Sequence, residues 1–117
     1  MEIGRRYIYV DTDNETYAGD VVSITDNMVT IQNRSCESYK NSLDLFHIEL
    51  NLIKWIFLLD NLIEGHQYFF TLNKDNKIIE GTFINISGIN DSVYLQTTNS
   101  GVVLFSIYEV NDIHKIL

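Results

Sequence analysis

The feature that most constrains this chain is an internal repeat, because residues 4–56 match residues 65–116 segment by segment and in the same order. The matched segments are Gly4–Tyr9 with Gly65–Phe70, Tyr17–Ile24 with Ile79–Ile86, Val29–Gln32 with Val93–Gln96, Leu45–Ile48 with Leu104–Ile107, and Leu50–Ile56 with Val110–Ile116. Chance likeness between strands rich in Ile and Asn would not preserve this order with such short gaps. The repeat therefore predicts two diverged copies of one small unit.

Chain length limits how independent the two copies can be. The sequence has 117 residues, so each copy has about 60, which is near the lower limit for a domain that folds alone. It contains no proline, and the join at Asp60–Asn61 is too short to act as a flexible linker. We therefore expect repeats over residues 1–60 and 61–117 that pack together as one compact unit.

Each copy has the pattern of five short strands. Beta-branched and aromatic residues dominate the expected strands, and the Asp13–Glu15 turn offers Asn14 for the left-handed conformation of a tight hairpin. Gly19 and Gly81 lie inside the long second strands, where glycine lets a strand bend sharply. The predicted fold class is all-β, with two tandem five-stranded small barrels.

One segment fits a second interpretation. Residues 42–64 contain no glycine or proline, have a possible cap at Ser42 and end before Gly65, so they could form a helix and give an α+β fold. Charges at Asp44, Glu49 and Lys54 exclude a membrane span there. The strand-like run Val102–Tyr108 in the second copy favours strand, turn and strand instead.

The pattern of Gly4, Tyr17-x-Gly19-x-Val21, Ile24 and Asp26 resembles the first motif of Sm-like proteins, which are five-stranded members of the small SH3-like barrels. Residues 48–56 are similar to the second Sm motif, Ile-Arg-Gly-Asn-x-Val-x-x-Ile, over nine positions. The resemblance covers both copies. It implies a tandem small barrel, and binding of single-stranded RNA or DNA is the function that it would imply.

The residues that hold an RNA base in that family are replaced here. Glu49 and Leu50 occupy the positions of its Arg-Gly pair, and Met28 occupies the position of its asparagine. Ser92 takes the asparagine position in the second copy. The chain has eight Lys and Arg against sixteen Asp and Glu, a net charge of -8, which repels a phosphate backbone. Nucleic acid is therefore a disfavoured partner.

The sequence shows no catalytic, metal or cofactor motif. His47, His66 and His114 lie at no recognised metal-ligand spacing, and a surface histidine is the simpler interpretation of His47 than a general base. Cys36 is the only cysteine, so no internal disulfide can form. We expect a protein that is not an enzyme, has no cofactor or membrane span, and resides in the cytoplasm, or in the host cytoplasm if it is viral.

Two segments are predicted to form interaction surfaces. Trp55, Ile56, Phe57 and Leu58 are apolar on both faces of a strand, which predicts that one face fills the first barrel and the other is buried by the second copy or another subunit. The second copy ends soon after Ile116, which predicts a shorter last strand there.

The loop at 33–44 is the second predicted surface. It is about five residues longer than its counterpart, and loops on a rigid scaffold commonly bind partners. Its candidate contact residues are Arg34, Tyr39 and Lys40, and an inert insertion is the alternative.

Together these features predict a non-enzymatic binding or assembly module that acts through protein contacts, with a homo-oligomer expected. The high Asn, Ile and Asp content without proline suggests an AT-rich genome. A phage or viral factor that interferes with a host protein or signalling ligand fits that composition. The alternative is an Sm-like nucleic-acid-binding protein.

Overall fold

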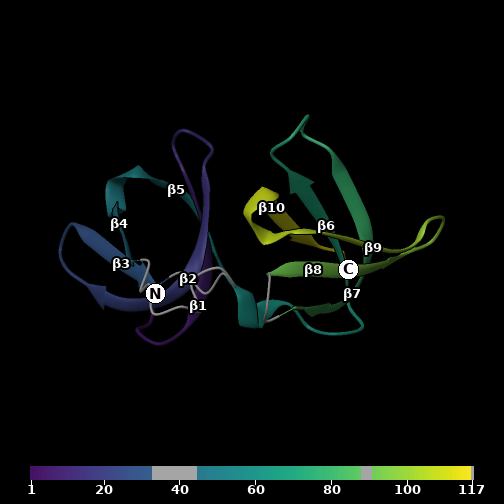
Figure 1. Ribbon diagram of the computed structural model, residues 1–117, viewed down its shortest axis with the longest axis horizontal. Coiled ribbons are helices and arrows are strands. Elements are labelled where there is room, and N and C mark those ends of the chain that lie inside the picture. The colour runs from purple at the N-terminus through teal and green to yellow at the C-terminus, as the bar shows by residue number, and fades with distance from the viewer. Residues whose placement is uncertain (33–44, 88–90, 117) are drawn as a thin grey trace. The chain divides into compact units, whose positions relative to one another are not determined.

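A computed structural model describes residues 1–32, 45–87 and 91–116, and shows an all-β protein (Figure 1). Its strands are β1 (Arg6–Asp11), β2 (Thr16–Ile24), β3 (Met28–Gln32), β4 (Leu45–Glu49), β5 (Ile53–Leu58), β6 (Gln67–Leu72), β7 (Ile78–Ile86), β8 (Ser92–Thr97), β9 (Gly101–Ser106) and β10 (Val110–Lys115). The 3₁₀ turns within the described residues are η2 (Leu50–Leu52), η3 (Leu59–Asn61) and η4 (Ile107–Glu109). The all-β prediction is confirmed.

The helical alternative for residues 42–64 is wrong over its described part, 45–64. These residues form β4, η2, β5 and η3, and β4 and β5 pair with β3 and β1. β4 and β5 are the two edge strands of the first sheet. The segment therefore has to cross from one edge to the other and pairs with β3 and β1 instead of forming one helix.

The chain divides into two compact units, Met1–Leu59 and Asp60–Leu117, one residue from the expected boundary. Each unit is one five-stranded antiparallel sheet. The orders are β4-β3-β2-β1-β5 in the first unit and β9-β8-β7-β6-β10 in the second, so the strands follow the same topology twice. The two sheets therefore have the same connectivity, as a duplication would produce.

The core of each unit follows from alternation along its strands. In β1, Tyr7 and Tyr9 face a buried cluster formed with β2, β3 and β4, whose other members are Val21, Val29, Ile31 and Ile48. In β6, Tyr68 and Phe70 are buried in the same way. Because successive side chains of a strand point to opposite faces, these alternate residues place each core on one face of its sheet.

Strand pairing corrects the end of the sequence repeat. Tyr7 pairs with Gly19 and Tyr68 with Gly81, as the sequence match predicts. Asp11 and Leu72, however, pair with Ile53 and Val110, so Ile53 corresponds to Val110 and not to Ile113. The last matched segment of the repeat is therefore shifted by three residues along the chain. A bulge in each final strand accompanies this pairing.

Two further expectations concern strand ends and bends. The last strands have equal length, six residues in both β5 and β10, so the expected shortening of the second one is wrong. Asn14 adopts a φ of 64°, which confirms the left-handed turn residue. At Gly81, an added Cβ would lie 2.9 Å from the carbonyl oxygen of Gln96. Glycine is therefore required there, because the neighbouring strand β8 leaves no room for a Cβ atom.

Candidate functional site

The predicted interface residues lie on β5, an edge strand of the first sheet. Pairing of β5 with β1 places Ile56 and Leu58 opposite the core residues Tyr9 and Tyr7. Leu58 packs against the core, whereas Ile56 is 37 % exposed. Trp55 is partly buried on the opposite face of the strand. The four residues are thus divided between the two faces of the sheet.

The outer face of β1 and β5 is apolar as well. Phe57 and Trp55 pair with Ile8 and Val10, both fully buried, and the two aromatic rings stack with centroids 5.7 Å apart. Ala18 of β2, opposite Ile8, is also buried. Sequence reasoning missed Ile8 and Val10, although the unbroken apolar run Tyr7–Val10 was a signal for a strand buried on both faces.

The matching face of the second unit is different. Register places Phe69 and Thr71 of β6 beside His114 and Asp112 of β10. Phe69 is 38 % exposed, whereas its counterpart Ile8 is fully buried. The two copies have therefore diverged most clearly on their outer faces, where one has an aromatic pair and the other a polar pair.

A second apolar surface lies on β9, an edge strand of the second sheet. Val102 and Leu104 are 54 % and 61 % exposed on its outer face. They pair with Gln96 and Tyr94 of β8. Sequence reasoning did not single out these two residues, because their exposure depends on β9 lying at an edge.

The candidate contact residues of the long loop, Arg34, Tyr39 and Lys40, lie outside the described residues, as does Cys36. The described histidines all lie on exposed positions. His47 shares a hydrogen bond of 2.8 Å with the hydroxyl of Thr30, and His114 contacts the Asp112 carboxylate at 2.7 Å. Within residues 1–32, 45–87 and 91–116, no group of three metal-ligating side chains comes together.

One pocket lies in the first unit between the β2–β3 turn and η2. It has a volume of about 360 Å³ and is lined by Asp26, Asn27, Glu49, Leu50 and Asn51. Two of these, Glu49 and Leu50, are positions at which the Sm resemblance places the RNA-contacting Arg-Gly pair. Carboxylates in place of a cation make this pocket repulsive to phosphate.

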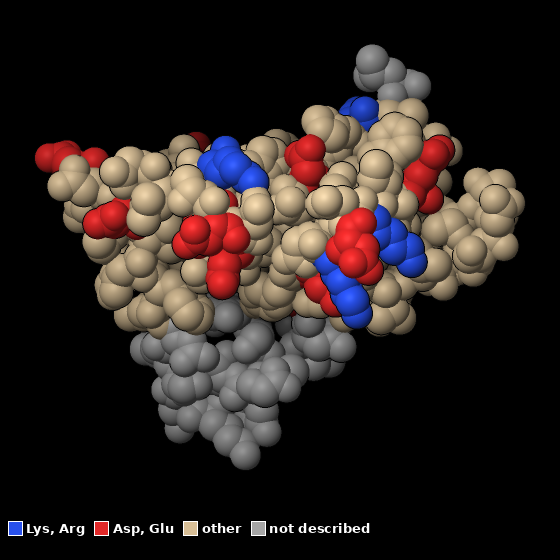
Figure 2. Space-filling view, turned by 90° about the horizontal axis from the view of Figure 1, so that it is seen from above, with Lys and Arg blue, Asp and Glu red and all other residues tan. Residues whose placement is uncertain are grey.

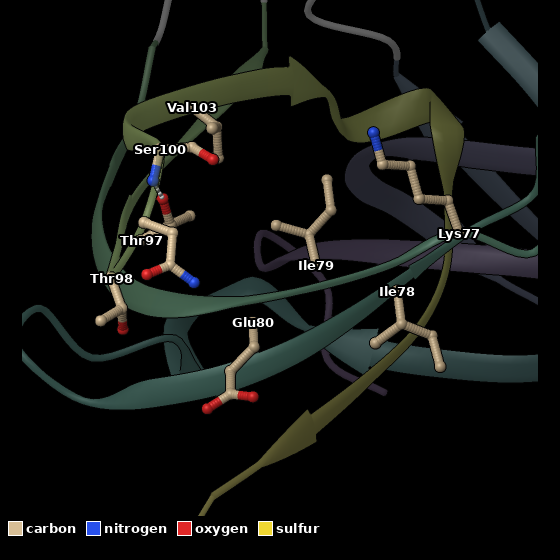
Figure 3. A pocket seen from close by; sticks show the side chains of 9 residues that line it. Lys77, Ile78, Ile79, Glu80, Thr97, Thr98, Ser100 and Val103 are labelled. Carbon is tan, nitrogen blue, oxygen red and sulfur yellow. Dashed lines mark hydrogen bonds between the residues drawn. The ribbon is translucent and has the colours of Figure 1, made fainter.

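Another pocket lies in the second unit, where the start of β7 approaches the β8–β9 turn (Figure 3). Its volume is about 330 Å³. Ile79 and Val103, both partly buried, supply apolar side chains, and Lys77, Thr97 and Ser100 supply polar ones. We call it the β7–β9 pocket. No sequence motif predicted this pocket.

The two units carry side chains of different size at the positions that line these pockets. Register makes Tyr17 and Phe46 the counterparts of Ile79 and Val103, and in the first unit these two rings contact each other with centroids 5.9 Å apart. Aliphatic side chains in their place leave the β7–β9 pocket open.

The pocket of the first unit has the converse relation to the second. The backbone N–H of Leu50 donates to Asn27, and that of Ile107 donates to Asp91, so Asp91 is the counterpart of Asn27. There, the Tyr108 hydroxyl donates to the carboxylate of Asp91, which is fully buried, over 3.0 Å. Tyr108 thus covers a place in the second unit that stays open as a pocket in the first.

Two tyrosines have perturbed ionisation. Burial raises the pKa of Tyr9 well above its usual range, and the nearby Tyr7 and Asp20 add to the effect. The pKa of Tyr17 is raised by burial and by the neighbouring carboxylates of Asp11 and Glu15. Both phenols remain protonated at neutral pH, so neither acts as a base there.

Charge on the described surface is mixed. On the face in Figure 2, Lys and Arg side chains lie scattered among Asp and Glu and form no continuous basic surface. In the part of the chain that the structure describes, no helix has the length and apolar character needed to cross a membrane. Searches against family models, curated proteins and solved structures give no match.

Proposed function

We propose that the protein is a non-enzymatic assembly module, built from two Sm-like small barrels, that acts through protein–protein contacts and forms a homo-oligomer. The single cysteine favours a reducing compartment, and we place the protein in the cytoplasm. The observation that carries the proposal is β9, an edge strand with two large, exposed aliphatic side chains.

Edge strands normally carry features that prevent pairing with other chains, such as charges or proline. The β9 sequence, Gly101–Ser106, has neither. Among the described strands only β8 pairs with it, so its second side offers backbone donors and acceptors. Val102 and Leu104 add apolar area to the same strand. A strand from another chain would pair with these backbone groups and would cover the two apolar side chains.

The first prediction concerns Leu104→Lys, which should dissociate the oligomer. Static light scattering of the wild-type protein should give a multiple of the chain mass of 13.6 kDa, and the variant should give a single chain. A lysine on the outer face of an edge strand opposes strand addition. The matched control is Ile78→Lys, because Ile78 is 63 % exposed, against 61 % for Leu104, but lies on β7, an interior strand.

The control variant should keep the wild-type mass. A wild-type protein that is monomeric over the whole micromolar range would contradict self-assembly. Equal masses for wild type and Leu104→Lys would instead remove β9 from the interface.

The second prediction separates this proposal from the nucleic-acid alternative. Labelled single-stranded RNA and DNA should show no binding at physiological salt in fluorescence anisotropy, because the net charge is -8 and Asp26 and Glu49 line the pocket of the first unit. Micromolar binding that weakens steeply with added salt would instead support an Sm-like nucleic-acid-binding role through another face.

A further inference from the structure

The β7–β9 pocket has a shape and a position that point to a specific kind of occupant. We infer that it binds one aromatic side chain of a partner protein, with an acidic group of the same segment beside Lys77. The inference rests on the proposed role in protein contacts and specifies what the partner must carry. It does not require the partner to be a second copy of the chain.

The first unit supplies the argument for an aromatic group. At the equivalent positions, the rings of Tyr17 in β2 and Phe46 in β4 contact each other, with centroids 5.9 Å apart. In the second unit Ile79 and Val103 stand at those positions, and a volume of about 330 Å³ stays open. That volume is at the small end of ligand pockets, which suits one side chain better than a large cofactor.

The pocket is held open by its own turn. The Thr97 hydroxyl donates to the carbonyl of Gly101 over 2.8 Å and accepts from the backbone N–H of Ser100 over 3.1 Å. Gly101 has a φ of 69°, a conformation that glycine adopts without strain. The wall of the pocket is therefore formed before any ligand arrives, which lowers the entropy that binding costs.

Charge at the rim indicates an acidic group next to the ring. Figure 3 shows Lys77 and Ile79 on one side of β7, whereas Ile78 and Glu80 point to the other side. Lys77 and Glu80 both line the pocket, and of these two charged side chains the one on the same side of the strand as Ile79 is Lys77. A carboxylate of the partner segment would pair with the Lys77 ammonium at the exposed rim.

The position of the pocket links it to β9. Val103 lines the pocket, whereas its neighbours Val102 and Leu104 are exposed on the opposite face of the same strand. A segment that pairs with β9 has alternate side chains on each face. One face would cover Val102 and Leu104, and a residue on the other face would reach the pocket. Aromatic anchors in such pockets commonly dominate interface energies.

The test uses the full chain with methyl groups of Ile, Leu and Val labelled with ¹³C, titrated with the blocked dipeptide Asp-Phe. We expect ring-current shifts at the methyls of Ile79 and Val103, with a dissociation constant on the order of 1 mM for so small a probe. Asp-Ala should leave these methyls unshifted. The Leu104 methyls, on the outer face, serve as an internal reference.

Two variants test the two parts of the inference. Ile79→Tyr/Val103→Phe copies the first unit into the second and removes both reporter methyls. It should abolish the shifts that Asp-Phe causes at the backbone amides of Thr97 and Ser100, and the dispersion of the amide spectrum shows whether the protein is folded. Lys77→Gln should weaken Asp-Phe binding roughly two- to fivefold and leave Asn-Phe binding unchanged. Ile63→Ala is the control, because Ile63 is 49 % exposed in the same unit and does not line the pocket.

Specific outcomes would overturn the inference. Asp-Phe that shifts no pocket methyl of the wild-type protein at 10 times the expected dissociation constant, or that shifts the Thr97 and Ser100 amides equally in wild type and in the double variant, excludes an aromatic site here. Equal binding of Asp-Phe and Asn-Phe to the wild-type protein excludes the acidic partner group. Neither result depends on the mass of the Leu104→Lys variant, so failure of this site and failure of self-assembly are separate findings.

Discussion

Replacing Phe70 with alanine should lower the free energy of unfolding of the second unit by about 3–5 kcal/mol. Phe70 is fully buried, and its ring packs edge-on against Phe105 at 5.2 Å and Tyr68 at 6.2 Å between ring centroids. Truncation removes these contacts and leaves a cavity that the neighbouring rings cannot fill. Urea denaturation followed by circular dichroism measures the loss. Total stabilities of 5–15 kcal/mol are typical, so the variant should be close to unfolding.

Phe69→Ala is the matched control, because it removes the same side chain from the next residue. Phe69 points to the other face of β6 and is 38 % exposed, so the expected loss is below about 1.5 kcal/mol. A larger loss for Phe69 than for Phe70 would contradict the register of β6, since a shift of one residue exchanges the two faces.

The contrast between Phe69 and Phe70 also shows what the sequence could predict. Strand positions and the turn at Asn14 follow from local patterns, because side-chain alternation and left-handed turn residues act over a few neighbours. Which of two adjacent aromatic residues faces the core is not local. In β6 this orientation depends on pairing with β7 and β10. Phe69 and Phe70 are both apolar, so the sequence alone does not distinguish them.

The three-residue error in the repeat has a similar cause. Sequence similarity matched Ile53 with Ile113. The positions of β5 and β10, however, are set by their hydrogen bonds to β1 and β6. Each of these strands contains a bulge and follows a 3₁₀ turn. These features lie at equivalent places in both units, so they do not cause the shift. It arises between the third and fourth strands, because Gln32 pairs with Leu45 whereas its counterpart Gln96 pairs with Val102, and the letters do not reveal this difference in spacing.

The preceding matched segment, Leu45–Ile48 with Leu104–Ile107, is shifted by two residues, and this smaller shift decides whether the β7–β9 pocket can be found from sequence. With the letter-based match, Phe46 corresponds to Phe105, and both copies have an aromatic residue at that place. With the observed register, Phe46 corresponds to Val103, and a ring is missing from the second unit. The pocket is therefore a consequence of size differences at equivalent positions, which can be compared only after the strands are paired.

Trp55 and Phe57 are the two predicted interface residues that lie on the outer face of β5. An apolar run on both faces of a strand needs cover on both faces, and the structure places these rings beside the buried Ile8 and Val10. Ile56 is another of the four predicted interface residues. Its 37 % exposure, at the edge of the sheet, now favours a smaller contribution.

Trp55→Ala should therefore destabilise the first unit by about 2–3 kcal/mol, below the 3–5 kcal/mol of a fully buried aromatic because Trp55 is only partly buried. The variant loses the stacking contact with Phe57 and exposes Val10, its partner across the strand pair. Ile56→Ala should lose less than half as much. Thermal melting gives both values, and light scattering on the same samples shows whether the oligomer dissociates. Equal and small losses, with the oligomer unchanged, would mean that the indole ring lies in solvent and that the outer face of β5 has no structural role.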